Sequence, residues 1–269
     1  MPPYAGACAL TTAVQVDVTD LVATLVLDCP PVNALDDQVV LAMDLALDEV
    51  DDSDARVMVW RSSIEAIFSA GADISYIEQC ISSGGTGVKR MLSFVKKLQD
   101  VLVRIESHHL PSIALIEGAA VGGGLEFALS CDIRVAGSRA RFGLPEAKIG
   151  LLPGAGGTQR LTRIAGPGVS ARLILESDLI SATEAKALGI IQHLVGEGDA
   201  SQEAYRIARA MAAIPSGVLG RVKNCISVAP TEAGYEMELR FTEELLNEES
   251  TLERIKDFLP THSERNKSK

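Results

Sequence analysis

A run of three glycines separates an apolar segment from a helix-forming segment near the middle of the chain. Residues 113–116, Ile-Ala-Leu-Ile, have the composition of a buried strand; Gly122, Gly123 and Gly124 follow, and residues 125–131 favour a helix. A strand that enters a helix through such a turn leaves backbone N–H groups without acceptors at the helix N-terminus. Because glycine lets a ligand approach the backbone closely, this pattern predicts a site for an anion or a developing oxyanion.

Two glutamates lie beside glycine-rich turns in this part of the chain. Glu126 falls in the first turn of the expected helix, where the helix dipole favours negative charge. Glu146 follows Pro145, and a second glycine-rich turn covers residues 150–159. A single glutamate is most often solvated, and a glycine cluster most often marks tight packing. Two carboxylates beside backbone donors shift the interpretation modestly toward an acid–base site.

Composition sets limits on the fold and on the partners. The chain has 269 residues, of which 47% are hydrophobic, so it can form one large domain or two small ones. Its net charge of −11 argues against a nucleic-acid partner. No segment has the roughly 18 consecutive apolar residues of a membrane span, and the first residues lack a signal-peptide pattern. We therefore expect a cytoplasmic protein without a membrane or nucleic-acid partner.

Several motifs point away from common cofactors. The five cysteines are scattered and contain no Cys-x-x-Cys pair, which favours reduced thiols over a disulfide scaffold or zinc site. Residues 82–87 are rich in Ser and Gly, but no Gly-Lys-Ser/Thr follows, so we expect a flexible loop over the site rather than a Walker loop. Gln159 stands where the dinucleotide pattern needs its third glycine. The sequence implies neither a metal nor a redox cofactor.

Strand and helix patterns alternate through the first two thirds of the chain. Residues 14–18 and 22–27 predict a hairpin, residues 56–61 predict a buried strand, and residues 88–107 predict an amphipathic helix. Such alternation is typical of α/β architecture with parallel strand pairing. His108 and His109 are interpreted as helix-end residues, and His193 as a packed residue. Helical patterns dominate later, at residues 202–214, 216–228, 231–247 and 251–259.

Four segments together resemble the signature of the crotonase superfamily, the enoyl-CoA hydratases and isomerases. The segments are Gly122-Gly123-Gly124-Leu125-Glu126, Cys131-Asp132, Phe142-Gly143-Leu144-Pro145-Glu146 and residues 153–161, and their order and spacing fit across about the whole chain. The resemblance implies a crotonase (ClpP/crotonase-like) fold of repeated ββα units in residues 1–200, which would hold the acyl-CoA site. It also implies a helical trimerisation region at residues 201–260. Residues 261–269 would form a disordered polar tail.

The resemblance assigns roles to individual residues. The N–H groups of Ala72 and Gly123 would form an oxyanion hole, Glu126 would deprotonate a water, and Glu146 would deliver a proton to C2. Ser75 stands where many relatives have a lysine, so no cationic contact to the cofactor is expected there. The expected substrate-binding residues are Ala70, Gly71, Ala72, Asp73, Ile74, Gly122, Gly123, Pro145 and Gly154.

The resemblance implies an enoyl-CoA hydratase of fatty-acid or related acyl-CoA degradation, assembled as a homotrimer or homohexamer. Water would add across the 2,3 double bond of a trans-2-enoyl-CoA to give a 3-hydroxyacyl-CoA, with coenzyme A as part of the substrate. Both glutamates are present, as in the family's hydratases, whereas many isomerases use only the one at the position of Glu146. An enoyl-CoA isomerase, a dehydratase for a specialised acyl-CoA and a non-catalytic acyl-CoA-binding protein remain alternatives. A hydrolase is disfavoured because no Gly-x-Ser-x-Gly motif occurs.

Overall fold

The computed structural model describes residues 13–215 and 217–259, and its contacts divide the chain into two compact units. Unit 1 extends to Ala213 and unit 2 begins at Ile214. A boundary was expected after residue 200, but the helix that follows belongs to unit 1 because its apolar face packs against the central sheet. The polar tail expected at residues 261–269 lies outside the described residues.

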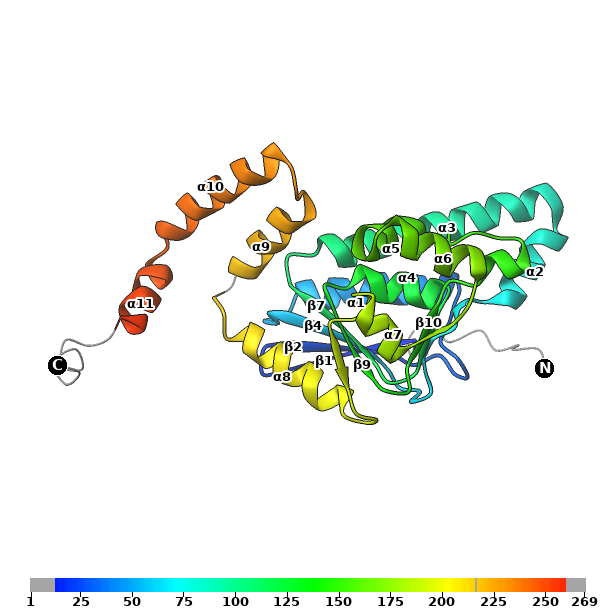
Figure 1. Ribbon diagram of the computed structural model, residues 1–269, viewed down its shortest axis with the longest axis horizontal. Coiled ribbons are helices and arrows are strands. Elements are labelled where there is room, and N and C mark those ends of the chain that lie inside the picture. The colour runs from blue at the N-terminus through cyan, green and yellow to red at the C-terminus, as the bar shows by residue number, and fades with distance from the viewer. Residues whose placement is uncertain (1–12, 216, 260–269) are drawn as a thin grey trace. The chain divides into compact units, whose positions relative to one another are not determined.

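Unit 1 is built around a six-stranded sheet with the strand order β1-β2-β4-β7-β9-β12 (Figure 1). The predicted hairpin is confirmed, since β1 and β2 pair antiparallel, and the other neighbouring strands pair parallel. This arrangement confirms the α/β architecture expected from the sequence. The strands are β1 (Val14–Thr19), β2 (Val22–Leu27), β4 (Val57–Ser62), β7 (Ser112–Ile116), β9 (Ile133–Gly137) and β12 (His193–Val195).

Helices bury both faces of this sheet. On one face, Val57 and Val59 pack in a cluster with the alanine-rich side of α8 (Ala200–Ala212). On the other face, Met58 and Trp60 belong to the main core beneath α1 (Asp37–Asp51), α3 (Gly84–Ser107) and α4 (Gly123–Ser130). Figure 1 shows α8 on the opposite side of the sheet from α1 and α4. Burial on both faces explains why strands such as β4 and β7 are continuous apolar runs.

Two smaller sheets include the strands that lead toward the glycine turn. A four-stranded sheet has the order β11-β10-β8-β5, and β3 pairs parallel with β6. Strand β8 was not predicted; it lies between the apolar run at residues 113–116 and the glycines, and only three residues form it. The strands are β3 (Ala34–Leu35), β5 (Ile67–Ser69), β6 (Gly71–Ala72), β8 (Ala119–Val121), β10 (Arg141–Gly143) and β11 (Ile180–Ser181).

The flexible loop predicted at residues 82–87 is wrong, because this segment is part of two successive helices. One residue separates the end of helix α2 (Ile74–Ser82) from the start of α3 at Gly84. Gly87 allows the two helices to meet, since a Cβ atom there would lie 1.6 Å from the carbonyl oxygen of Cys80. Gly87 therefore serves close helix packing here rather than flexibility. The remaining helices of unit 1 are η1 (Glu146–Ile149), α5 (Gly157–Ala165), α6 (Pro167–Glu176) and α7 (Ala182–Ala187).

The described residues of unit 2 form three helices close to the predicted positions: α9 (Val218–Ser227), α10 (Glu232–Leu246) and α11 (Glu249–Phe258). Thr231 caps α10, since its side-chain oxygen accepts a hydrogen bond from the N–H of Gly234. Trimerisation through this unit stays a prediction. Within residues 13–215 and 217–259, no helix has the length and apolar composition that a membrane crossing requires.

Candidate active site

A pocket of about 550 Å³ in unit 1 contains both predicted glutamates. It is bounded by α2, α3, the beginning of α4 and the segment from Pro145 to Ala155. Most of its wall is aliphatic or aromatic, as in small-molecule sites that hold a few placed polar groups. Its apolar side chains include Ile77, Met91, Phe94, Val95, Leu98 and Leu152.

Most of the residues predicted for the site line this pocket. Gly71 and Asp73 do not line it, and the structure gives them supporting positions instead. Asp73 caps α2, because its Oδ1 accepts hydrogen bonds from the backbone N–H groups of Ser75 and Tyr76 at 2.7 and 3.2 Å. The predicted residues that line the pocket are Ala70, Ala72, Ile74, Gly122, Gly123, Glu126, Pro145, Glu146 and Gly154.

The two expected oxyanion donors come from segments that are in close contact. A Cβ atom on Gly71 would lie 2.7 Å from the nitrogen of Gly123, and one on Gly123 would lie 3.4 Å from the nitrogen of Ala72. Gly71 and Gly122 have φ angles of 86° and 55°, in the region that favours glycine. Gly123 is the first residue of α4, where a helix supplies no intrahelical acceptor for the N–H group. The arrangement suits two N–H donors that share one oxygen.

A buried asparagine that the sequence did not single out supports this backbone. Asn33 is fully buried, and its side-chain Nδ2 donates a hydrogen bond to the backbone carbonyl of Phe68 at 3.0 Å. The backbone carbonyl of Asn33 accepts a hydrogen bond from the Ser69 hydroxyl at 2.7 Å. The Ser69 hydroxyl in turn accepts from the N–H of Gly71 at 3.1 Å. The network fixes the strand that leads into Ala72. In the sequence, this network is indicated only by the presence of an asparagine in the short segment before α1.

Glu126 is buried and held by a loop across the pocket. Only 3% of the residue is exposed, and its Oε1 accepts hydrogen bonds from the N–H groups of Ala155 and Gly157 at 2.8 and 2.7 Å. Burial raises the pKa of Glu126 to about 7; the nearby Glu146 adds to the rise, whereas the two amides and Arg160 oppose it. A carboxyl group with this pKa can take up and release a proton near neutral pH.

Glu146 lies at the start of η1, just beyond β10, and faces the same pocket. Its Oε2 is buried and has no hydrogen-bond partner among the residues that the structure describes. Its Oε1 lies 3.1 Å from the position that a Cβ atom on Gly122 would take. Burial raises the pKa of Glu146 above its ordinary value, so the protonated form is favoured. An unpaired carboxyl oxygen at the wall of a pocket can exchange a proton with a bound molecule.

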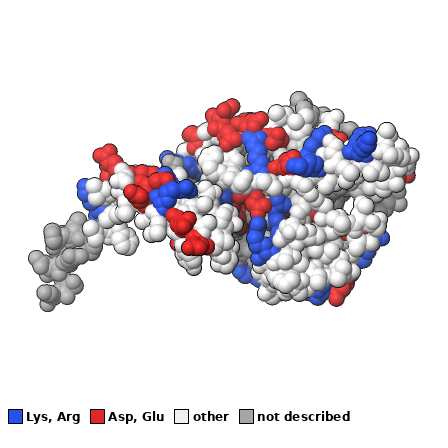
Figure 2. Space-filling view, turned by 90° about the horizontal axis from the view of Figure 1, so that it is seen from above, with Lys and Arg blue, Asp and Glu red and all other residues white. Residues whose placement is uncertain are grey.

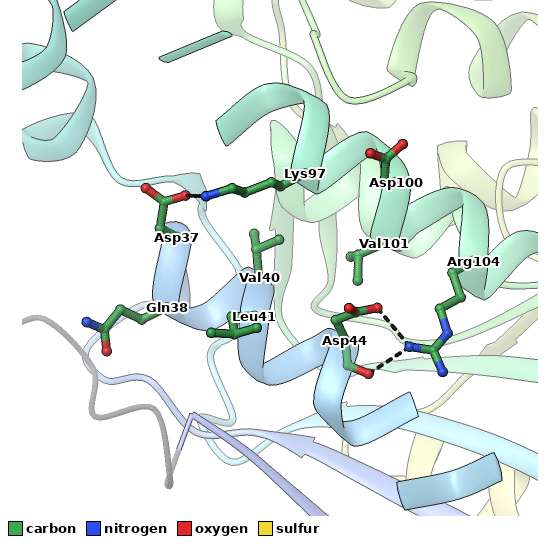
Figure 3. Close-up of a pocket in the computed structure, with 9 residues that line it drawn as sticks. All are labelled: Asp37, Gln38, Val40, Leu41, Asp44, Lys97, Asp100, Val101 and Arg104. Atoms are coloured by element: carbon green, nitrogen blue, oxygen red, sulfur yellow. Dashed lines mark hydrogen bonds and ion pairs between the residues drawn. The ribbon is translucent and has the colours of Figure 1, made fainter. Parts of the chain in front are cut away.

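A larger pocket, about 710 Å³, lies between α1 and α3 and lacks these properties (Figure 3). Its charged groups pair with their neighbours: Lys97 with Asp37 at 2.9 Å, and Arg104 with Asp44 at 2.8 Å. Asp100 also faces this pocket, and it pairs with Lys96. Since its acids and bases are mutually satisfied and largely exposed, we assign the chemistry to the smaller pocket.

The described histidines are engaged in structural contacts. His108 ends α3, as predicted, and its Nδ1 accepts a hydrogen bond from the N–H of Leu110, which leaves the Nε2 proton facing Asp51 at 3.0 Å. Asp51 also accepts from Arg104, so this cluster, which includes His109, fixes the helix end rather than offering free metal ligands. His193, predicted to be packed in apolar surroundings, is instead half-exposed and lies 3.4 Å from Glu203.

Charged side chains of both signs are present on the surface, as the composition indicates. Figure 2 shows Lys and Arg side chains interspersed with Asp and Glu on the face in view. An ion-pair network illustrates the mixing, with Arg139 lying 3.0 Å from both Glu65 and Glu197. On this face the mixing differs from a clustered positive surface, and the absence of a nucleic-acid partner stays a prediction.

Comparisons with known proteins agree with this geometry. The family model for enoyl-CoA hydratase/isomerase matches residues 18–268. A human enoyl-CoA hydratase domain-containing protein 2, mitochondrial, is 44% identical over 162 residues, covering 60% of this chain and 53% of the relative. A mouse methylglutaconyl-CoA hydratase, mitochondrial, is 40% identical over 177 residues, covering 65% and 54%. The chain thus spans about half the length of these curated relatives.

A solved structure shares the fold over nearly the whole chain. The enoyl-CoA hydratase from Bacillus anthracis superimposes with a TM-score of 0.85 and 29% sequence identity, covering 91% of this chain and 95% of that one. The fold predicted by resemblance is therefore confirmed, apart from the trimerisation assigned to its C-terminal helices. The chain belongs to the enoyl-CoA hydratase/isomerase family of the crotonase superfamily.

Proposed function

We propose that this protein hydrates a trans-2-enoyl-CoA to a 3-hydroxyacyl-CoA. The proposal rests on two buried carboxyl groups in one apolar pocket. Two backbone amides fix Glu126, and Oε2 of Glu146 has no hydrogen-bond partner among the described residues. Hydration needs one group that accepts a proton from water and another that supplies a proton to carbon. Family membership makes an acyl-CoA thioester the natural substrate.

Each group has a separate task in the proposed reaction. The N–H groups of Ala72 and Gly123 bind the thioester oxygen as negative charge moves onto it. Glu126 takes a proton from water as the water oxygen bonds to C3. Glu146 then gives its proton to C2, so one water molecule is added in total. The proton that Glu126 gained then passes to Glu146, directly or by exchange with solvent, and this restores the starting protonation of both groups.

The fixed position of Glu126 favours hydration over double-bond isomerisation. Moving a proton between two carbons needs one carboxyl group, which Glu146 could supply. A second carboxylate, held at a defined angle by two backbone amides, has no task in that reaction, whereas hydration requires a group that orients and deprotonates water. Isomerisation is the alternative that the assay below distinguishes from hydration. Dehydration of a specialised acyl-CoA is a second alternative, which needs a 3-hydroxyacyl-CoA as the substrate of its test.

The simplest test uses purified protein and crotonyl-CoA. Loss of the conjugated enoyl-thioester absorbance, with 3-hydroxybutyryl-CoA as the product, is the expected result. Absorbance that stays constant, together with conversion of a 3-enoyl-CoA to the conjugated isomer, would replace hydration by isomerisation.

The pocket lining predicts a preference for uncharged hydrocarbon acyl groups. Among the described residues that line the pocket, Lys148 is the one with a positive charge. Its side chain is exposed, and it lies 3.3 Å from Asp178. A methylglutaconyl group ends in a carboxylate, and burying a carboxylate against an apolar wall is costly. We expect kcat/KM for crotonyl-CoA to exceed that for methylglutaconyl-CoA by about tenfold or more. Comparable values, with a selective loss for methylglutaconyl-CoA in Lys148→Met, would contradict this preference.

The raised pKa of Glu126 predicts a pH-dependent rate. Glu126 must be deprotonated to accept a proton, so kcat/KM should rise as the pH increases through about 7. Burial also raises the pKa of Glu146, which widens the pH range over which this group can carry the proton for C2. Because the two carboxyl groups interact, replacing one of them should also move the pH at which the other titrates. A flat profile from about pH 5 to pH 9 would exclude this task for Glu126.

Assembly and location remain predictions from the sequence. A homotrimer or homohexamer is expected from the resemblance, and light scattering on the purified protein measures it. The two curated relatives above are named as mitochondrial proteins, whereas the composition of this chain led us to expect a cytoplasmic one.

A further inference from the structure

Both amides that hold Glu126 belong to the loop at residues 154–157, and α3 holds this loop from outside the pocket. The Nε2 of Gln99 donates a hydrogen bond to the carbonyl oxygen of Gly154 at 2.6 Å. That carbonyl and the N–H of Ala155 belong to the same planar peptide group. Gln99 and Glu126 therefore bind the two ends of one peptide group, at 2.6 and 2.8 Å.

A second anchor holds the next peptide group of the loop. The Nη1 of Arg160 donates to the carbonyl oxygen of Ala155 at 2.8 Å, and its Nε donates to Glu106 at the same distance. Arg160 is only 4% exposed, so this pair is largely shielded from water. Glu106 lies two helical turns after Gln99 on α3, so both residues project toward the loop.

Close packing also restricts the 154–157 loop. A Cβ atom on Gly157 would lie 3.0 Å from Oε1 of Glu126, and one on Gly154 would lie 3.3 Å from Cγ1 of Val95. Val95 precedes Gln99 by one turn of α3 and lines the pocket, whereas Gln99 does not. The backbone of the loop thus lies between α3 and Glu126, with little room to move.

We propose that Gln99 and the Arg160–Glu106 pair are positioning residues, which fix the 154–157 loop so that its amides hold Glu126 in place. The catalytic consequence of this inference rests on the proposed hydratase function, but the effect on Glu126 does not. None of the three side chains lines the pocket, so they act through the loop rather than on the substrate.

If the loop amides hold Glu126, loosening the loop should change the pKa of Glu126 in a known direction. Amide donors favour the charged carboxylate, so a loosened loop should raise the pKa of Glu126 further. The charged groups that act on Glu126 are Glu146 from η1 and Arg160 from α5. Replacing Gln99 changes neither charge. Any change in titration would therefore report the loop amides.

The test is a carbon-13 NMR titration of Glu126 in the full chain with labelled glutamate side chains, assigned by comparison with Glu126→Gln. In the unaltered protein the resonance should titrate near pH 7. Gln99→Met keeps the side-chain size but removes the donor, and it should raise that pKa by about one unit. Lys96→Met, on an exposed position of the same helix, is the matched control and should leave the titration unchanged.

Kinetics with crotonyl-CoA provide the second readout. Gln99→Met should lower kcat about tenfold and leave KM within about twofold, because the residue does not line the pocket. Arg160→Lys keeps the charge but reaches only one of the two acceptors, so it should shift the Glu126 titration in the same direction as Gln99→Met.

An unchanged Glu126 titration in both folded variants would overturn the inference, even if their melting temperatures fell. If the titration shifts but the unaltered protein hydrates no enoyl-CoA, the proposed function fails and the positioning of Glu126 stands. If the unaltered protein is active and both variants match it in titration and in kcat, the function stands and the positioning fails.

Discussion

Glu146→Gln should lower the rate of enoyl-CoA hydration on the order of 10³-fold, because an amide cannot deliver the proton that C2 requires. Oε2 of Glu146 is buried and lacks a hydrogen-bond partner within the described part of the chain, and burial raises the pKa of this group. Both features suit a group that delivers a proton at the wall of the pocket. The measurement is kcat for crotonyl-CoA under saturating conditions.

The loss should be chemical rather than structural. Glutamine has nearly the same shape, so the melting temperature and the affinity for a saturated acyl-CoA should stay close to those of the unaltered protein. Glu176→Gln, on the exposed end of α6, is the matched control and should retain full activity. Near-normal turnover by Glu146→Gln would remove this residue from the mechanism.

Glu126→Gln should also reduce hydration strongly, by about 10²-fold to 10³-fold, because the amide cannot deprotonate water. The glutamine oxygen can still accept the hydrogen bonds from Ala155 and Gly157, so the loop should keep its position. The acidic limb of the pH profile, where kcat/KM rises through about pH 7 as Glu126 loses its proton, should disappear in this variant. Any isomerase activity of the protein should suffer less than hydration.

Glu117→Gln provides a matched control for this second variant. Glu117 also accepts a hydrogen bond from a backbone N–H, that of Ala200 at 2.9 Å, but it does not line the pocket. Its replacement should leave the pH profile unchanged. An acidic limb that persists at the same pH in Glu126→Gln would assign that limb to another group.

Local sequence patterns were sufficient to predict most of the architecture. The β1–β2 hairpin follows from period-two alternation, and the buried parallel strands follow from short apolar runs. The loop predicted at residues 82–87 was wrong because glycine has two opposite uses. Here Gly87 lets α2 and α3 approach closely, and the requirement comes from Cys80, a contact that composition does not reveal.

The two carboxyl groups of the site were predictable, but their supports were not. Glu126 and Glu146 stand next to glycine turns, and a family signature surrounds them. Asn33, Gln99 and Arg160 act through contacts with residues 35, 55 and 5 positions away in the chain, and a single sequence does not identify such partners. Asn33 and Gln99 fall within segments whose patterns indicate only a loop or an amphipathic helix, and Arg160 falls within a signature segment that does not reveal its contact.

Isotope labelling tests whether this pocket adds water to an enoyl thioester. Crotonyl-CoA is incubated with the purified protein in ¹⁸O-labelled water, and the acyl-CoA products are analysed by mass spectrometry. We expect a 3-hydroxybutyryl-CoA that carries one ¹⁸O atom at C3, formed by the unaltered protein and nearly absent with Glu146→Gln. Products that have the mass of the substrate and contain no label, or labelled product formed equally well by Glu146→Gln, would contradict it.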